Sequence, residues 1–245
     1  MSIGRVAIQT VSLSFFRFPS AYGRLWAFAQ MGLARRPMKR IRDLQFWKLF
    51  GSGTGEGFTP VPNTEVYAIL AVWPSFDIAK SRLEDEGLFN RYRNKCAEHW
   101  TVFLQTSSVR GRWSDANPFE PGTATDDGPI AALTRATIKP SVALQFWKRV
   151  PAISTVIGSD SSVLFKIGVG EVPWFHQVTF SIWPDLTSMS HFARKDGPHA
   201  RAIKAVRAGD WFSEELYARF AVREAVGSWQ GKNPLAAFKP EEGGP

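Results

Sequence analysis

Apolar and polar side chains alternate along short stretches of the chain, a pattern typical of β-strands with one buried face. The stretches that we interpret as strands are residues 8–16, 45–50, 66–72, 101–105, 130–138, 163–167, 177–183 and 215–222. Apolar residues recur at helical spacing in the segments that we interpret as helices, residues 24–33, 77–95, 142–157 and 186–206. The order βαββαβ therefore occurs twice, and it is the order of a ferredoxin-like unit.

An internal repeat relates the two parts of the chain. Trp73 and Trp183 are 110 residues apart, and Gly87 and Gly197 have the same spacing. A fixed spacing of this kind indicates two copies of one structural unit. The predicted fold class is α+β: tandem ferredoxin-like repeats that form a dimeric α+β barrel, with both sheets closed into one β-barrel and the helices outside.

The repeat also sets the predicted domain boundaries. Residues 1–109 are the N-terminal repeat, which we interpret as structural, and residues 129–227 are the C-terminal repeat, which we interpret as functional. Residues 110–128 are rich in Gly, Pro, Asp and Asn and are the predicted linker. Residues 228–245 are expected to form a loosely held tail.

Two short sequence matches need an interpretation within this repeat. A Gly-x-Gly-Glu sequence occurs at residues 53–56 and 168–171, and we interpret both copies as turns, the first being longer by five residues. The identical pentapeptides at 44–48 and 144–148 are 100 residues apart, a spacing that would align a strand with a helix. We treat the identity of the pentapeptides as coincidence and keep the spacing of 110.

The glycine-rich segment at residues 51–57 resembles a phosphate-binding loop in sequence. It fails the GxGxxG pattern because Glu56 occupies the place of the third glycine and no helix follows directly. A glycine-rich β-turn is the better interpretation.

Charge and composition narrow the class of protein. The chain of 245 residues has a net charge of +8, and much of the excess lies in residues 35–42. Three interpretations of this basic stretch stay open: a solvated helix end, contact with an anionic membrane surface, and docking of an acidic protein partner. Nucleic-acid binding is not expected, because no nucleic-acid-binding motif is recognisable.

The remaining composition points to a cytoplasmic protein with a large aromatic core. Ten Trp and nineteen Phe could fill a core or line a ligand pocket. The single cysteine, Cys96, excludes an internal disulfide. No stretch has the length of a membrane-spanning helix, and the N-terminus does not have the pattern of a signal peptide.

His199 is the first candidate for a functional side chain. The spacing of 110 pairs it with Phe89, so an imidazole replaces a packing ring in the second copy. Pro198 suits the first turn of a helix, which would place His199 near a helix start. A haem iron needs only one proximal imidazole, and His199 could supply it from a pocket between helices and sheet. A structural histidine is the alternative.

His176 is the second candidate and lies near the start of a predicted strand. Its counterpart is Val66, on a face that is otherwise apolar, so it could be a ligand, a distal hydrogen-bonding group or a structural residue. The opposite face of the strand becomes polar in the second copy, as expected where a pocket holds water or ligand. The paired residues on that face are Tyr67 and Gln177, Ile69 and Thr179, and Ala71 and Ser181.

Two cations lie within predicted strands of the second copy. Arg135 is flanked by apolar residues, and Lys166 lies between Phe165 and Ile167. Either could stabilise bound oxygen or a haem propionate. Each could instead be a solvated or strand-edge residue.

At these residues the chain strongly resembles the spheroidene monooxygenase family, oxygenases of the carotenoid pathway in purple bacteria. The segments that carry the resemblance are residues 24–31, 50–60, 129–137, 165–173, 176–185, 197–199 and 214–220. They extend from about residue 8 to residue 225 and are specific as a set. The basic stretch and the tail look particular to this chain.

The resemblance implies an oxygenase that introduces a keto group at C-2 of an acyclic carotenoid by successive hydroxylations. It implies haem b with its iron, molecular oxygen and a ferredoxin-type electron donor. The fold is similar to that of tandem dimeric α+β barrel proteins, several of which hold haem between sheet and helices. Our assignment of the axial ligand is His199 first and His176 second, with Arg135 and His176 as catalytic residues and Lys166, Gln177 and Thr179 beside the cofactor.

Other functions stay open beside this one. A non-oxygenase haem protein of the same fold, such as a peroxidase-like protein or a dehydratase, would bind haem without oxidising a carotenoid. A cofactor-free binding module would bind polyenes without turnover. Peripheral contact with the inner membrane and assembly into a homo-oligomer are further options.

Overall fold

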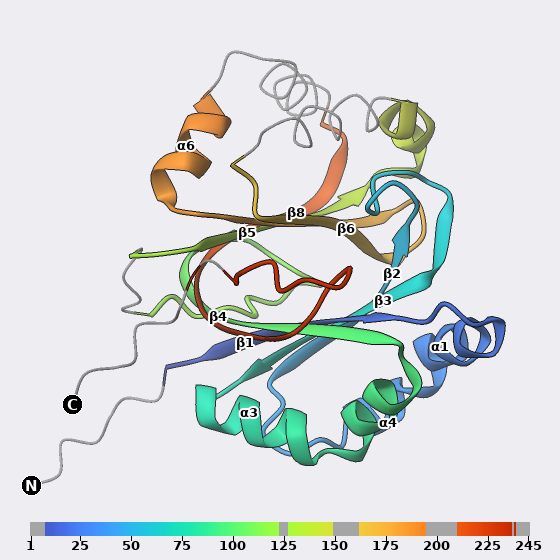
Figure 1. Ribbon diagram of the computed structural model, residues 1–245. Coiled ribbons are helices and arrows are strands. Elements are labelled where there is room, and N and C mark those ends of the chain that lie inside the picture. The colour runs from blue at the N-terminus through green and yellow to red at the C-terminus, as the bar shows by residue number, and fades with distance from the viewer. Residues whose placement is uncertain (1–7, 123–126, 149–161, 195–209, 237, 239–245) are drawn as a thin grey trace, which may run out of the picture.

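Eight antiparallel strands close into a β-barrel (Figure 1). The computed structural model describes residues 8–122, 127–148, 162–194, 210–236 and 238. The strands are β1 (Thr10–Arg17), β2 (Phe46–Gly53), β3 (Pro62–Trp73), β4 (Glu98–Gly111), β5 (Ile130–Ile138), β6 (Phe165–Val172), β7 (His176–Trp183) and β8 (Phe212–Gly227). The expected barrel in an α+β fold is confirmed.

The barrel consists of two halves with the same strand order. The first half has the order β4-β1-β3-β2 and the second half the order β8-β5-β7-β6. The two seams between the halves differ in length. Strands β4 and β8 pair from Trp100 to Gly111, whereas β2 and β6 pair only at Gly51 with Gly170 and at Ser52 with Val169.

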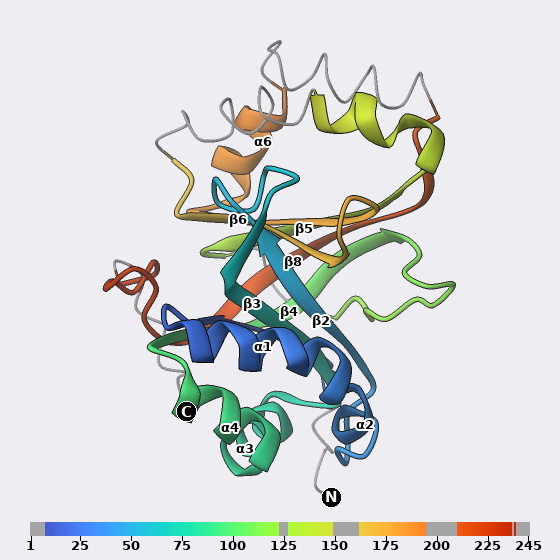
Figure 2. The ribbon, with the colours of Figure 1, turned by 90° about the vertical axis from the view of Figure 1, so that its right-hand side faces the viewer.

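Helices cover the outside of both halves. On the first half lie α1 (Ala21–Leu33), α2 (Arg35–Met38), α3 (Phe76–Asp85) and α4 (Gly87–Lys95). On the second half lie the 3-10 helix η1 (Pro140–Val142), a helical segment at residues 143–148 and α6 (Leu186–Arg194). Figures 1 and 2 show the two helical layers on opposite sides of the barrel.

Local sequence explains where several helices begin and end. Ser20 caps α1 by accepting a hydrogen bond from the backbone N–H of Gly23 at 3.1 Å, and Ser75 caps α3 in the same way through Ile78 at 3.3 Å. The single helix expected at residues 77–95 is two helices, because Glu86 has an extended backbone with ψ at 123°. The strand expected at 45–50 is confirmed as β2, and residues 144–148 are helical as expected, so the shared pentapeptide is a coincidence of sequence.

The second Gly-x-Gly-Glu sequence is not a turn, contrary to expectation. Residues 168–171 belong to β6, and the turn to β7 occupies residues 173–175. Glycine fits this part of the strand because the other half approaches it closely: a Cβ atom on Gly168 would overlap with the carbonyl group of Gly57. The first copy is a turn as expected, and its connection, residues 54–61, is the longer one.

The barrel interior is filled by side chains. Its core combines inward-facing residues of all eight strands with four residues that follow the last strand of each half: Trp113, Phe119, Trp229 and Leu235. The tail was expected to be loose, but Trp229 and Leu235 are buried. Trp113 and Trp229 belong to a second repeat, Gly-x-Trp-x-x-x-Asn-Pro, which occurs at 111–118 and again at 227–234, and Phe119 and Leu235 directly follow its two copies.

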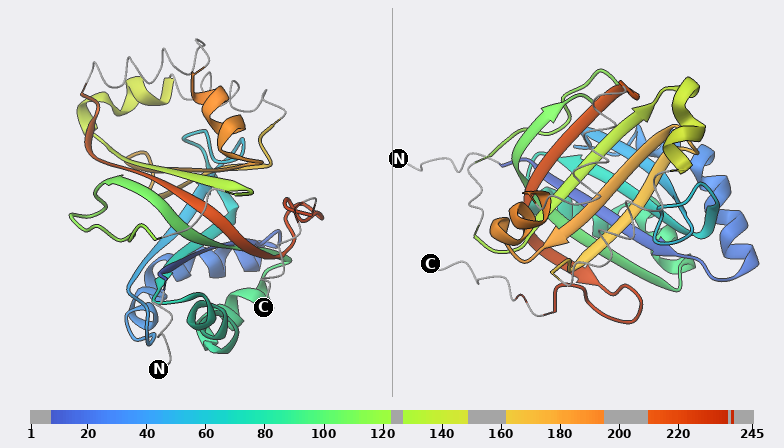
Figure 3. Two further views of the ribbon diagram at one scale, coloured as in Figure 1. Left: turned by 90° about the vertical axis from the view of Figure 1, so that its left-hand side faces the viewer. Right: turned by 90° about the horizontal axis from the view of Figure 1, so that it is seen from above.

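Each copy of this repeat forms a small plug in the barrel, which we call the Trp113 plug and the Trp229 plug. Trp113 pairs with Ala116 and Trp229 with Lys232 through reciprocal backbone hydrogen bonds. The two plugs lie on opposite sides of the barrel (Figure 3). Gly111, with φ at 97°, begins one plug, and a Cβ atom there would overlap with the carbonyl oxygen of Glu215.

Candidate functional site

The sheet of the second half carries a face of small and polar side chains beneath its helices, which we call the second-half outer face. On β5 and β7 its residues are Ala132, Thr134, Ala136, Gln177, Thr179 and Ser181. The alternate residues of the same strands, such as Leu133 and Phe180, face the barrel core. The face is therefore the side of the sheet that points away from the barrel and toward the helices.

The first half fills the corresponding face with larger side chains. Strand pairing sets Thr10 opposite Trp73 in the first half and Ile130 opposite Trp183 in the second, which fixes the equivalent positions. The equivalent residues at which the first half has the larger or less polar side chain are Phe16 and Ala136, Tyr67 and Gln177, and Ile69 and Thr179.

Packing follows this difference in size. The ring of Phe16 lies 5.0 Å from that of Tyr92 of α4, and Ile69 is buried in the same helix-covered core. In the second half Thr134, Gln177 and Thr179 are only half-buried by the described residues. These three side chains are thus less buried than their counterparts in the first half, Ser14, Tyr67 and Ile69.

The β2–β3 connection of the first half reaches across the seam to the edge of this face. The backbone N–H of Gly168 donates to the carbonyl oxygen of Glu56 at 2.7 Å, and Lys166 Nζ lies 2.8 Å from Glu56 Oε2. Gly57 has φ at 89° and lies so close to Gly168 that a Cβ atom would overlap with it. Next to it, Phe58 packs into the second half with Phe146 and Trp147 among others.

Arg135 lies on the other side of the sheet, at the barrel end closed by the Trp113 plug. Its side chain is 2% exposed, forms an ion pair with Glu214 and lies 5.9 Å from the ring of Trp113. Glu214 also accepts hydrogen bonds from the backbone N–H groups of Ser114 and Asp115 at 3.1 and 2.9 Å. Burial alone would raise the pKa of Glu214, but these donors and Arg135 outweigh it and lower the pKa.

A second ion pair closes the same end of the barrel beside His176. Lys48 Nζ lies 2.7 Å from Glu171 Oε2, and Trp113 Nε1 donates to Glu171 Oε1 at 2.7 Å. Burial lowers the pKa of His176; Glu171 opposes this shift, and Arg135 and Lys48 add to it. The imidazole is therefore neutral at neutral pH, and its buried Nδ1 has no hydrogen-bond partner among the described residues.

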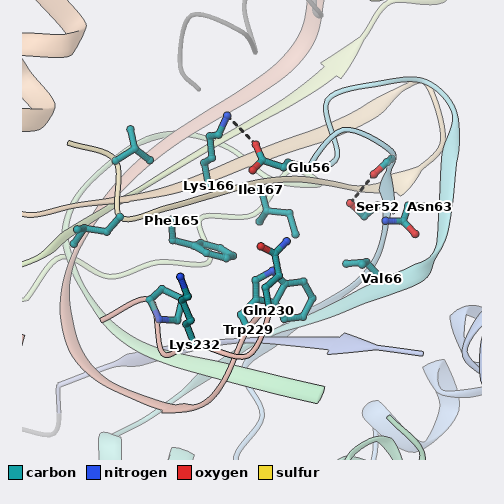
Figure 4. A pocket seen from close by; sticks show the side chains of 14 residues that line it. Ser52, Glu56, Asn63, Val66, Phe165, Lys166, Ile167, Trp229, Gln230 and Lys232 are labelled. Atoms are coloured by element: carbon teal, nitrogen blue, oxygen red, sulfur yellow. Dashed lines mark hydrogen bonds and ion pairs between the residues drawn. The ribbon is translucent and has the colours of Figure 1, made fainter. Parts of the chain in front are cut away.

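A pocket of about 430 Å³ lies beside the Trp229 plug (Figure 4). Val66, Phe165, Ile167 and Trp229 are among its apolar lining residues. Its polar lining residues are Ser52, Glu56, Asn63, Lys166, Gln230 and Lys232. The ion pair between Lys166 and Glu56 borders this pocket, so the cation of Lys166 is already neutralised.

A second pocket, of about 260 Å³, is mainly apolar, and we call it the apolar pocket. It lies between α1, the β2–β3 connection and the turn from β6 to β7, and Phe28, Met31, Trp147 and Trp174 are among its lining residues. The Trp147 indole donates to the carbonyl oxygen of Trp174 at 3.0 Å and fixes this wall. Gln177 also lines the pocket, so the apolar pocket adjoins the second-half outer face.

The structure separates the predicted site residues into two groups. Gln177, Thr179 and Lys166 lie on the outer side of the sheet, whereas Arg135 and His176 lie together at a barrel end. The first candidate, His199, lies outside the described residues.

Sequence reasoning missed the partners of Arg135 and His176, namely Trp113, Glu171 and Glu214. The Gly-x-Trp-x-x-x-Asn-Pro repeat was the available signal for the first of them. Its copies are 116 residues apart, so a search at a spacing of 110 passes over it.

Comparison with known proteins gives close sequence relatives. The chain is 52% identical to spheroidene monooxygenase of Cereibacter sphaeroides over 230 residues, 93% of this chain and 71% of the relative. It is 49% identical to spheroidene monooxygenase of Rhodobacter capsulatus over 94% of this chain and 97% of the relative. It is 31% identical to spheroidene monooxygenase of Rubrivivax gelatinosus over 85% of this chain and 80% of the relative. No family model matches the sequence.

Solved structures with a similar fold are distant in sequence. One is an aldoxime dehydratase with a TM-score of 0.63 and 9% identity, covering 91% of this chain and 85% of its own. Another is an aldoxime dehydratase in complex with butyraldoxime, with a TM-score of 0.58 and 10% identity; the match covers 89% of this chain and 81% of the dehydratase chain. At such low identity these likenesses concern the fold alone.

Proposed function

The chain belongs to the spheroidene monooxygenase family, and from this premise we propose that it is an oxygenase that introduces a keto group at C-2 of an acyclic carotenoid such as spheroidene. Identity near 50% over most of the chain is the observation that carries the proposal. The proposed co-substrate is molecular oxygen, and the proposed electron donor is a reduced ferredoxin.

The proposed reaction consists of two hydroxylations at one carbon. Each inserts one atom of O2 into a C–H bond, while two electrons and two protons reduce the other atom to water. The second hydroxylation gives a carbon with two hydroxyl groups, which loses water and leaves the ketone. The substrate offers no acidic C–H bond or ionisable group at C-2, so the protein must supply an oxygen-activating cofactor rather than a general base.

The residues of the second-half outer face fit a bound haem b. We interpret the two halves as tandem ferredoxin-like repeats of a dimeric α+β barrel, an interpretation supported by their common strand order. Replacement of Phe16 by Ala136, and of Ile69 by Thr179, leaves space on one face only. A flat apolar macrocycle needs such space between sheet and helix, and when bound it would supply the redox chemistry.

In this proposal His199 would hold the haem iron. Its counterpart Phe89 packs beside Trp73 on the helix-covered face of the first half, with ring centroids 6.3 Å apart. An imidazole at the equivalent position would face the second-half outer face. The alternative ligand is His176, whose charged neighbours, Arg135, Lys48, Glu171 and Glu214, belong to the barrel end.

The other proposed site residues take roles that fit their positions. Thr179 and Gln177 would contact the cofactor or the substrate from the sheet, and Lys166 would hold the β2–β3 connection through Glu56. The apolar pocket adjoins Gln177 and would receive part of the polyene. The positions of Arg135 and His176 favour a role in holding the barrel end that supports β5 and β7.

Absorption spectroscopy followed by product analysis tests the proposal. Protein supplied with haem should give a Soret band, and spheroidene with reduced ferredoxin and O2 should give a product with a C-2 keto group. His199→Ala should lose the Soret band, and His191→Ala is the matched control because His191 is exposed on α6.

Three results would contradict parts of the proposal. Haem binding without ketone formation would favour a non-oxygenase haem protein of this fold. A protein that stays colourless but binds the carotenoid would favour a cofactor-free module. Loss of haem in His176→Ala but not in His199→Ala would transfer the axial role to His176.

A further inference from the structure

The solvent-facing side of α1 is apolar along its whole length. Tyr22, Leu25, Phe28 and Leu33 are 66 to 70% exposed, and the other exposed residues of the helix are Ala21, Ala29 and Gly32. At 100° per residue these positions form one continuous stripe. We call it the α1 stripe.

Neighbouring helices show that the α1 stripe is unusual for this protein. The exposed residues of α3 are Asp77, Ser81, Glu84 and Asp85, all of them polar. Water is the normal environment for such a face, whereas an apolar face on the outside of a helix indicates a partner. Lys95 Nζ lies 5.3 Å from the ring of Tyr22, but the described residues leave the four large side chains of the α1 stripe mostly exposed.

A cluster of cations follows the C-terminal end of the α1 stripe; of these, Arg42 lies 3.9 Å from a carboxylate oxygen of Asp43. Arg35, Arg36, Lys39, Arg40 and Arg42 are exposed and follow directly after α1. The sequence between residues 18 and 42 contains no Asp or Glu. Figure 2 shows α2 beside the end of α1, on the same side of the molecule. This combination of an apolar stripe and flanking cations is complementary to an anionic lipid surface.

The α1 stripe continues into the apolar pocket. Phe28 belongs to both, and Met31 of the same helix lines the pocket. On the far side of the pocket Val172 and Trp174 are exposed apolar residues of the turn between β6 and β7. A surface on which α1 rests would therefore also cover the mouth of the pocket.

We propose that α1 and α2 dock on an anionic phospholipid bilayer, with α1 in the plane of the interface and the mouth of the apolar pocket toward the acyl chains. No helix among the described residues is long and apolar enough to cross a bilayer. The 13 residues of α1 suit an in-plane position, since a spanning helix needs about 20 residues. The docking itself does not depend on the proposed reaction; the role of the pocket as the entrance for a lipid-dissolved carotenoid does.

Flotation with lipid vesicles tests the docking without any turnover. The wild-type protein should float with vesicles of phosphatidylcholine and phosphatidylglycerol, and the bound fraction should fall as salt is added. The double variant Leu25→Gln, Leu33→Gln should lower the vesicle partition coefficient by about tenfold or more, because each change removes an apolar side chain from the interface. Neither residue lines the apolar pocket.

Charge variants separate the two contributions. Arg35→Gln with Arg36→Gln should reduce binding to anionic vesicles severalfold and leave the weaker binding to pure phosphatidylcholine unchanged. The matched control is Arg223→Gln with Lys232→Gln, which removes the same charge from exposed positions on β8 and the Trp229 plug. Val226→Gln, at an exposed apolar residue of β8, is the control for the leucine variant. Both controls should bind within about twofold of the wild type.

Three results would overturn the proposal. The first is a wild-type protein that stays with neither kind of vesicle. The second is a leucine variant that floats like the wild type while its melting temperature shows that it is folded. The third is a wild-type protein that self-associates and a leucine variant that is monomeric, with neither of them binding vesicles. That result would mean that a second copy of the chain covers the α1 stripe. Ketone formation from detergent-dispersed spheroidene should survive in the leucine variant, so failure of docking and failure of the proposed function remain distinguishable.

Discussion

The two halves of the barrel share a strand order, but the outer faces of their sheets are used differently. In the first half Phe16, Tyr67 and Ile69 pack against α3 and α4 and leave no room. In the second half Ala136, Gln177 and Thr179 occupy the same positions. The difference teaches that one copy of a duplicated fold can keep the packed layer that stabilises the barrel, while the other copy carries smaller or more polar side chains on the same face, as the proposed cofactor site requires.

The barrel ends show the same kind of divergence on the inner side of the sheets. Trp229 packs against Phe15, with ring centroids 5.8 Å apart, whereas Trp113 lies over the guanidinium group of Arg135. Phe15 and Arg135 are equivalent positions of β1 and β5. At the Trp229 plug a ring therefore packs against a ring, and at the Trp113 plug a ring packs against a buried, ion-paired cation, within plugs of the same backbone design.

The largest effect is expected when the second-half outer face receives first-half residues. Ala136→Phe with Thr179→Ile should lower haem affinity by about 100-fold or more, since added side chains occupy the space proposed for the cofactor and a packed core accepts extra volume poorly. Ketone formation should fall with it. Titration of the protein with haem, followed by the Soret band, measures the change.

The reverse exchange in the first half is the control. Ile69→Thr should lower the free energy of unfolding by about 2 to 3 kcal/mol, because a buried methylene group is lost and a hydroxyl group is buried. Haem bound per folded molecule should not change. Equal loss of haem in both variants would mean that the two faces do not differ in function.

The next largest effect concerns the carboxylates that hold the two plugs. Glu214→Gln should lower the free energy of unfolding by about 3 kcal/mol, because it leaves the buried cation of Arg135 without a counter-charge. Glu98 is the equivalent residue at the Trp229 plug, and its partner Arg17 is 39% exposed. Glu98→Gln should therefore lower the free energy of unfolding, measured by urea denaturation, clearly less than Glu214→Gln does. Equal losses in the two variants would contradict the difference between the two barrel ends.

Acid should separate the wild type from Glu214→Gln. The pKa of Glu214 is lowered from its ordinary value of 4.5 in the folded protein. Its contribution is therefore present above pH 4.5 and is lost as pH falls through the lowered pKa. The wild type should lose stability in this acidic range more steeply than the variant, as measured by melting temperature against pH.

Sequence reasoning could recover the architecture because alternation and turns are local properties. The strands that begin near Ile130 and Gln177, and the closure of two sheets into a barrel, follow from patterns in single segments. The turn assigned to residues 168–171 failed because glycines there serve a close approach to Gly57, a contact between segments far apart in the sequence.

The candidate site was predicted less completely than the fold, for a similar reason. The polar character of Gln177 and Thr179 was visible by comparison with the other copy. Arg135 is two residues from Leu133 in the same strand, so both side chains face the barrel core. Its partner Glu214 lies 79 residues away, and no local pattern connects the two residues. The two plugs were not recognised because the copies of their sequence are 116 residues apart, whereas the repeat was aligned at a spacing of 110 residues.

The plugs themselves should respond alike in both halves. Gly111→Ala and Gly227→Ala should each lower the free energy of unfolding by about 2 kcal/mol or more. Both glycines have positive φ, and a Cβ atom would overlap with the carbonyl oxygen of Glu215 at Gly111 and with that of His99 at Gly227. Gly231 also has positive φ, but nothing lies within 4 Å of its Cβ position.

The matched control for the plug glycines is Gly231→Asp. The equivalent residue of the first plug is Asp115, with φ at 60°, so this backbone already accepts an aspartate. The variant should cost about 1 kcal/mol or less in urea denaturation. A difference of more than about 1 kcal/mol between the costs of the two alanine variants would contradict the equivalence of the plugs.

The smallest effect is expected from giving His176 the residue of the first half, His176→Val. Burial lowers the pKa of His176 from 6.5 in the folded protein, so protonation favours the unfolded chain. The wild type should therefore lose stability as pH falls below about 6.5, and the loss is complete below the lowered pKa. The variant carries the uncharged side chain of its counterpart Val66 and should lack this part of the acid sensitivity. Melting temperatures between pH 7.5 and pH 5 measure the difference, with His191→Val as the exposed control; parallel curves for wild type and His176→Val would mean that the imidazole titrates as freely in the folded protein as in the unfolded chain.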